Sequence, residues 1–433
     1  MLIDPRRVRL VSSAVLDQAI LSATNFVVGF LLIRYTTDQD YGLYVLVQSA
    51  LMLVVTVHNA WLTGPVVITV PKLSTPVRRD TISAIKLEQR RWVARIALPL
   101  LLIPLCAYFL GYLPATLAFV VAFGIVAGWT ALRREYLRSV LLIYSRPQSL
   151  LGADIAYALT LLLGAGVALM IGHHVVVFAT VALIIAACVG AYAADRSLSQ
   201  KPGWGVAQAV SIWPDIRRLG FWSMIGAGIY WFLGQSYTYM LATRLDLHAV
   251  ADVGATRLLV NPTFILTMGV VSLLNPSAAR WYNELGASRM VRRLLAIVLL
   301  LGGAELLFLL VVWFCRDWII DDVLHKQIHD RNLLLLLWAG VALMSVVRDV
   351  LQCSLIAMGQ LKTLAWQVGI SAVIALAVMW WGMPVWGAAA ALIGQIIGEA
   401  VNLGGIIYAL QRSLASNKGP LSLGTQVSPD SAL

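Results

Sequence analysis

Charged residues are scarce in this chain: Asp, Glu, Lys and Arg make up 12% of its 433 residues, whereas 60% are hydrophobic. Soluble domains carry about a quarter charged residues, so most of this chain cannot face water. Long apolar runs such as 98–109 and 294–314 do not alternate, which excludes a membrane β-barrel. We therefore predict an all-α polytopic membrane protein, because lipid offers no partner for an open strand edge.

Paired cysteines and nucleotide-binding motifs are lacking as well. The four cysteines lie scattered in or beside apolar runs and predict neither a disulfide framework nor a zinc site. No Gly-Lys-Ser/Thr phosphate-binding loop is present, so any pumping would use an ion gradient. We predict no catalytic residue, metal or cofactor, and leave coupling to H⁺ or Na⁺ open.

The net charge of +11 lies in the loops between apolar runs rather than in one patch, which argues against a nucleic-acid partner. A membrane helix needs roughly 20 apolar residues, and the apolar runs predict twelve spans. Their approximate positions are 11–34, 43–69, 92–112, 115–137, 150–171, 175–194, 219–243, 252–275, 292–315, 333–357, 363–382 and 386–410.

Lys and Arg set the orientation, because they accumulate on the cytoplasmic side of a membrane. With the N-terminus inside, only six of the 32 basic residues fall on the outer side: Arg34, Arg244, Arg257, Arg316, Lys326 and Arg331. A wrong number of spans would scramble this bias. We therefore predict that both termini are cytoplasmic.

Two stretches recur at a nearly constant offset. Arg134-Glu135 and Arg348-Asp349 lie 214 residues apart, and Gly42 with Pro65 has a counterpart in Gly254 with Pro276. An even number of spans in each half makes the halves parallel. We predict an N-terminal six-helix lobe (1–194), a cytoplasmic linker (195–218), a C-terminal six-helix lobe (219–412) and a disordered cytoplasmic tail (413–433).

Polar side chains form stripes at helical spacing on the first two spans of each half. Charge and amide groups inside a membrane usually face a cavity or a partner, so a hydrated cavity between the halves is predicted. Hydrogen bonding between helices is the competing explanation. The predicted substrate-cavity residues are Asp17, Asn25, Gln48, Asn59, Tyr230, Tyr237, Arg257, Asn261 and Asn275.

Four further charges lie near inner helix ends: Arg134, Glu135, Arg348 and Asp349. We predict ion pairs there that lock the cytoplasmic side, with a gating role as the alternative. Arg257 is the preferred anion contact, since a guanidinium suits phosphate or carboxylate. Asp17 is the preferred protonation site, ahead of Asp154, Glu305 and Glu399.

Several of these motifs resemble the polysaccharide-export proteins, the Wzx-type O-antigen flippases. That family shares a superfamily (multidrug/oligosaccharidyl-lipid/polysaccharide, MOP) with multidrug extrusion antiporters and the lipid II flippase. The resemblance covers nearly the whole chain through Asp17-Gln18, Asn25-Phe26, Arg34, Asp40-Tyr41-Gly42-Leu43-Tyr44, Gly254, Pro276-x-x-Ala279-Arg280 and Gly387-Ala388-Ala389-Ala390. Family members usually carry a charge in the seventh span, where this chain has Tyr237 and Thr238.

The resemblance implies two six-helix lobes in a V around a central cationic cavity, in the bacterial cytoplasmic (inner) membrane. The implied cargo is an undecaprenyl-diphosphate-linked oligosaccharide for surface polysaccharide biosynthesis, moved by alternating access, and a polysaccharide polymerase is a candidate partner. Two alternatives stay open. A cation-coupled multidrug antiporter would need a carboxylate-dominated cavity, and a membrane glycosyltransferase or polymerase would need larger outer loops.

Overall fold

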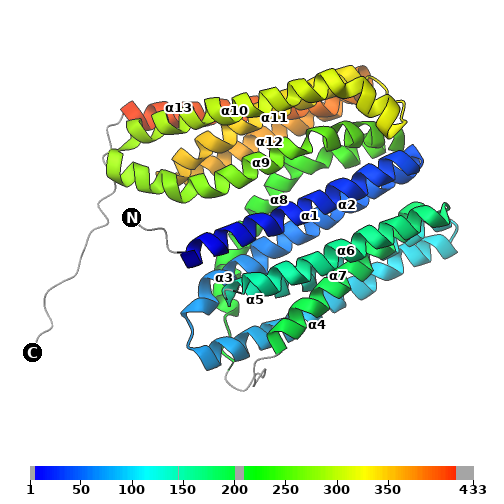
Figure 1. Ribbon diagram of the computed structural model, residues 1–433, viewed down its shortest axis with the longest axis horizontal. Coiled ribbons are helices and arrows are strands. Elements are labelled where there is room, and N and C mark those ends of the chain that lie inside the picture. Colours follow the sequence, from blue (N-terminus) through cyan, green and yellow to red (C-terminus); the bar gives the residue numbers. More distant parts are fainter. Residues whose placement is uncertain (1–4, 145, 200–208, 416–433) are drawn as a thin grey trace, which may run out of the picture.

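The computed structural model describes residues 5–144, 146–199 and 209–415, and these are helical with short connections (Figure 1). Its twelve long helices are α1 (Pro5–Tyr35), α2 (Asp38–His58), α4 (Thr75–Phe109), α5 (Ala115–Ile143), α6 (Pro147–Ile171), α7 (Val175–Ser199), α8 (Trp213–Arg244), α9 (Leu247–Leu285), α10 (Ala287–Asp317), α11 (Arg331–Ala357), α12 (Leu361–Trp386) and α13 (Ala389–Ala415). The shorter elements are η1 (Asn59–Thr63), α3 (Gly64–Thr69), η2 (Val70–Lys72) and η3 (Trp318–Leu324).

Eleven of the helices in the described ranges are long and apolar enough to cross a membrane. The remaining long helix, α8, contains the seventh predicted span. The fold is therefore that of an all-α multi-pass membrane protein. One predicted connection is helical instead: α4 begins at Thr75 rather than near 92. At 35 residues it is about 52 Å long, longer than the roughly 30 Å hydrocarbon core, so its charged first half extends into the aqueous phase.

The two halves of the chain repeat one packing plan. In the N-terminal lobe α1 packs on α6, α2 on α5, and α7 on both α5 and α6. In the C-terminal lobe α8 packs on α12, α9 on α11, and α13 on both α11 and α12. The lobes meet where α1 and α2 lie against α8 and α9 (Figure 1). The residues 200–208 of the predicted linker and 416–433 of the predicted tail lie outside the described ranges.

The buried apolar residues are shared between the lobes chiefly at one end. We name this the outer end, where α1 ends and α2 begins, following the orientation predicted from charge. One continuous core joins both lobes there, with Tyr41, Tyr237 and Val253 among its members. At the inner end there are two cores. One lies around Tyr136 in the N-terminal lobe and takes in Ile216 at the start of α8, and the other lies around Val350 in the C-terminal lobe. The lobes thus share a broad core at the outer end, and at the inner end they meet only through the start of α8 among these clusters.

Helix α2 is followed directly by the π-helical turn η1 and then by α3, which has Pro65 in its first turn. Thr37 caps α2 by accepting from the backbone N–H of Asp40 at 3.2 Å, as its type and position favour. Further on, Pro65 has no N–H to offer the carbonyl of Trp61. Gly220 of α8 packs against that carbonyl so closely that a Cβ would lie 2.2 Å from its oxygen. A bulkier residue at 220 would therefore part α8 from η1.

Candidate functional site

Charged groups close the outer end between the lobes. Nζ of Lys326, which follows η3, donates to the carboxylate of Asp38 at 2.6 Å and to the carbonyl of Thr36 at 2.7 Å. Nδ1 of His248 lies 3.5 Å from the other carboxylate oxygen of Asp38. The first side chain of α2 thus binds two segments of the opposite lobe.

Glycines allow α2 and α9 to cross closely at the same place. A Cβ on Gly42 would lie 2.4 Å from the carbonyl oxygen of Leu247, and one on Gly254 would lie 3.0 Å from Val45. The glycines that recur in the two halves of the sequence therefore both stand in one helix crossing. We call Asp38, Gly42, Leu247 and Lys326 the outer seal.

Gly42→Ala is expected to open the outer seal, because the methyl group meets a backbone oxygen that cannot turn aside. An Ala251→Cys reporter, buried in the same contact and placed in a background without the four native cysteines, should then react several-fold faster with an impermeant maleimide. Gly166→Ala is the matched control, since a Cβ there meets nothing within 4 Å. Equal labelling of the two alanine variants would contradict the expected opening.

Arg257 lies on α9, one turn inward of Gly254. Its Nη1 donates to Oε1 of Gln235 and to the hydroxyl of Tyr237, both at 2.9 Å, and its guanidinium lies 5.6 Å from the ring centre of Trp338. Within the described ranges it makes no ion pair, and it stays partly exposed. Neutral partners therefore orient a cation whose charge is left uncompensated.

Arg257 of α9 also brings a positive charge next to the seventh predicted span, which belongs to α8. The resemblance leads one to expect a charged residue near Tyr237, and the guanidinium of Arg257 reaches that side chain from the neighbouring helix. Sequence reasoning missed Gln235 and Trp338. Their proximity to Arg257 cannot be recognised from sequence spacing, because the two residues belong to other helices, α8 and α11.

Four other predicted cavity residues differ in burial: Asn25 of α1, Tyr230 of α8, and Asn261 and Asn275 of α9. Asn25 and Tyr230 are exposed, while Asn261 and Asn275 are partly buried inward of Arg257 on α9. The amide oxygen of Asn275 is buried and has no hydrogen-bond partner. Their assignment to a substrate cavity stays a prediction.

The two predicted residues from the second span have different surroundings. Gln48 donates to the hydroxyl of Tyr44 at 2.6 Å, a bond between neighbouring turns of α2. Asn59 opens the π-helical turn, and its amide oxygen is buried without a partner. Gln48 therefore has the hydrogen-bonding role that the competing explanation expects, and Asn59 has polar capacity to spare.

Five charged side chains form a buried cluster inside the N-terminal lobe. Arg138 contacts Asp17 at 2.8 Å, Asp154 at 2.9 Å and Glu135 at 3.1 Å. Arg134 pairs with Asp154 and, at 3.2 Å, with Glu135. Three carboxylates thus face two guanidiniums, and Oδ1 of Asp17 is buried with no partner. We call this group the N-lobe cluster.

A smaller cluster holds the equivalent place in the C-terminal lobe. Arg348 pairs with Asp349 at 2.9 Å and with Glu399 of α13. Two carboxylates face one guanidinium, and Oε2 of Glu399 is buried with no partner. In this C-lobe cluster, as in the N-lobe cluster, the ion pairs join helices of one lobe. A gating role for these residues stays a prediction.

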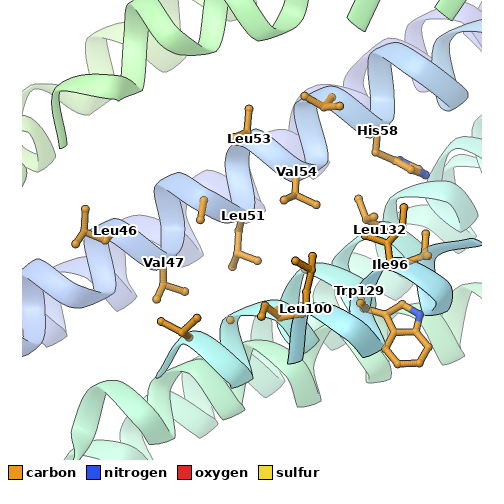
Figure 2. A pocket seen from close by; sticks show the side chains of 18 of the residues that line it. Leu46, Val47, Leu51, Leu53, Val54, His58, Ile96, Leu100, Trp129 and Leu132 are labelled. Carbon is orange, nitrogen blue, oxygen red and sulfur yellow. The ribbon is translucent and has the colours of Figure 1, made fainter. Parts of the chain in front are cut away.

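A large cavity lies elsewhere. It has a volume of about 990 Å³ and lies between α2, α4 and α5, with α8 contributing to one wall, and none of the predicted cavity residues is among its lining side chains. Figure 2 shows Val47, Leu51 and Val54 of α2 pointing across it toward Ile96 and Leu100 of α4. The sequence gives no motif for it, because aliphatic walls resemble any lipid-facing surface.

Comparisons with known proteins identify the fold. No family model and no curated protein matches the chain. An inward-facing multidrug-resistance transporter of the MATE family, of the MOP superfamily, matches with a TM-score of 0.76 and 10% identity over 92% of this chain and 95% of that one. The lipid II flippase MurJ, in an inward closed conformation, matches with a TM-score of 0.66 and 9% identity over 93% of this chain and 87% of that one. An outward-facing MATE transporter matches with a TM-score of 0.63 and 11% identity over 95% of this chain and 97% of that one.

Proposed function

We propose that this protein is a flippase that moves an undecaprenyl-diphosphate-linked oligosaccharide from the inner to the outer leaflet of a bacterial cytoplasmic membrane. Its fold, shared with the MATE transporters and with the lipid II flippase MurJ, supports a transport function. The sugar would serve surface or extracellular polysaccharide biosynthesis, with a polysaccharide polymerase as a candidate receiver.

The observation that carries this proposal is the uncompensated charge of Arg257. The arginines of the N-lobe and C-lobe clusters are paired with carboxylates, whereas Arg257 has only neutral partners. A guanidinium in that state binds a phosphate oxygen strongly, since charge-assisted hydrogen bonds are about twice as strong as neutral ones. A cationic drug would be repelled at the same point, which favours an anionic lipid head over a multidrug cargo.

The packing supports alternating access with this state as the inward-facing one. The broad core that joins α2 with α8, α9 and α11 lies at the outer end, whereas at the inner end the N-lobe core takes in only the start of α8 from the other lobe. The outer seal lies on the outer side of Arg257. A head group entering from the cytoplasmic side would reach Arg257 before it met the seal. The lipid chain would stay in the bilayer throughout, as its hydrophobicity requires.

The test is translocation by the purified protein in vesicles. A fluorescent undecaprenyl-diphosphate sugar is placed in both leaflets, and the outer pool is quenched or enzymatically cleaved at intervals. We expect protein-dependent loss of protection for the diphosphate-linked lipid and none for a neutral glycolipid. Equal movement of the neutral lipid, or efflux of cationic dyes instead, would transfer support to a scramblase or to a multidrug antiporter.

Ion coupling is the feature that an antiporter and a coupled flippase would share. Each buried cluster holds one carboxylate more than its guanidiniums can balance, and buried surplus charge favours the uptake of a proton or a small cation. Asp17 and Asp154 share Arg138, so one proton between them would balance the N-lobe cluster. We assign this role to Asp17, whose second oxygen has no partner.

Asp17→Asn is expected to remove the stimulation of transport by an imposed H⁺ or Na⁺ gradient while leaving gradient-independent exchange in place. The reason is that the amide is neutral and cannot alternate between charged and neutral forms. Vesicle assays with and without each gradient measure this, with the exposed Asp322→Asn as the matched control. Undiminished stimulation in the Asp17 variant would exclude it as the coupling site.

A further inference from the structure

The cavity between α2 and α4 is a groove whose walls are apolar, mostly aliphatic with several aromatic side chains. Its exposed lining residues include Val54, Ile96 and Leu100. Gly128 of α5 forms part of its floor, where a Cβ would still be 3.8 Å from Leu51 and Val54. The groove therefore has room for an apolar chain that the protein does not fill itself.

A basic pocket adjoins the inner end of this groove. The pocket has a volume of about 200 Å³ and lies between α4, α5 and α7, with Lys86, Arg90 and Arg133 among its lining residues. The groove and the pocket share three lining side chains, Val93, Trp129 and Leu132. An apolar space thus continues directly into a cationic one.

The charges of the basic pocket do not cancel. Its one carboxylate, Asp195 of α7, accepts from Lys86 at 2.5 Å and lies 3.7 Å from Arg133. Arg90 is exposed and makes no ion pair among the described residues. Three cations against one carboxylate leave a positive pocket, which suits a phosphate group.

The junction between the two spaces has the polarity of a membrane interface. Trp61, Trp92 and Trp129 line it, as aromatic side chains do at the depth of lipid head groups. His58, 3% exposed, bonds Gln89 at 2.8 Å through Nε2 and leaves Nδ1 without a partner. Figure 2 shows the His58 ring at the inner end of the groove. A spare polar atom there fits the glycerol or ester region of a lipid.

The groove is separated from the lobe interface by the contact of α2 with α8. Nε1 of Trp231 donates to the carbonyl of Ser49 at 3.2 Å, and the hydroxyl of Tyr239 donates to the carbonyl of Leu46 at 3.0 Å. A molecule in the groove would therefore not lie on the path past Arg257. This favours a resident lipid over the transported one.

We propose that the groove and the basic pocket together form a binding site for an anionic phospholipid of the inner leaflet. The phosphate would be held by Arg90, Arg133 and Lys86, and one acyl chain would lie between α2 and α4. Basic pockets between helices on the cytoplasmic side bind anionic head groups in this way.

Native mass spectrometry of the full chain, released from detergent with phosphatidylglycerol or phosphatidylcholine, tests the site. We expect the wild type to retain phosphatidylglycerol at least tenfold better than phosphatidylcholine. The variant Arg90→Gln/Arg133→Gln should lose that preference, since two basic residues near a membrane surface, at about 1 kcal/mol each, together correspond to roughly 30-fold. Gly128→Leu, which fills the floor of the groove, should reduce retention of both lipids.

Matched variants decide between a built site and diffuse attraction. Arg91→Gln/Arg95→Gln removes two exposed arginines from the same helix outside the pocket and should leave retention unchanged, whereas an equal loss would overturn the proposal. Gly166→Leu controls for the added volume, where nothing lies within 4 Å. Displacement of phosphatidylglycerol by equimolar undecaprenyl phosphate would also overturn it, because the groove would then belong to the cargo.

Discussion

Replacing Arg257 by alanine should lower transport of a diphosphate-linked lipid by about 10- to 100-fold while leaving the amount of protein in the membrane normal. The range follows from the roughly 1.5–3 kcal/mol that a hydrogen bond to a charged group contributes. Folding should be spared, because Gln235 and Tyr237 are neutral and the loss of Arg257 strands no buried charge. Vesicle translocation and quantitative membrane blotting measure the two quantities.

Two further variants separate charge from geometry. Arg257→Lys keeps the charge without the fork, and should retain part of the activity if a phosphate is the ligand. Arg244→Ala is the matched control: it removes an arginine from the adjoining helix α8 that stacks on Trp380 at 3.4 Å, away from Arg257. Normal transport by the Arg257→Ala variant would remove this residue from the site.

Replacing Arg348 by methionine should destabilise the protein by about 3–5 kcal/mol, the usual cost of removing one partner of a buried ion pair. Glu399 and Asp349 would then be left without their cation in the C-terminal lobe. A lower thermal midpoint of the detergent-solubilised protein, read by tryptophan fluorescence, measures the effect.

The double variant Arg348→Met/Glu399→Gln tests the cause. It removes the stranded charge as well as the cation, so most of the lost stability should return. A double variant as unstable as the single one would show that the guanidinium acts through packing. In that case charge balance would not be the reason why Arg348 stabilises the protein.

The fold could be predicted from the sequence because membrane helices are recognised by their length and apolar composition. The turn between α1 and α2, capped by Thr37, and the glycines 42 and 254 were readable from local patterns. The start of α4 was not. Residues 75–91 are helical but rich in charge, and that charge is typical of a connection between spans.

The clusters could be predicted only in part. Arg134 with Glu135 and Arg348 with Asp349 are sequence neighbours, but their further partners are distant: Asp17 is 121 residues from Arg138, and Glu399 is 51 from Arg348. These meetings depend on which helices pack together. Arg138, one turn after Arg134, had a helical spacing that sequence reasoning could have used.

The groove could not be predicted at all. It exists because α2 packs on α5 and α8, whereas α4 packs on α5 and leaves α2 uncovered along one side. No residue type in the sequence indicates that α2 and α4 do not pack together, since the side chains that line the groove are of the kinds that would otherwise face lipid. Only the adjoining Lys86, Arg90 and Arg133 give it a chemical identity.

The two lobes repeat a guanidinium and the acid next to it in sequence, but not the acid that a neighbouring helix supplies. At the offset of 214 residues Arg134 matches Arg348, whereas Asp154 matches Val368 and Glu399 matches Ile185. The acid comes from α6 in one lobe and from α13 in the other. The halves are therefore not interchangeable parts: a chain assembled from two copies of either lobe would keep the architecture and carry the same acid twice.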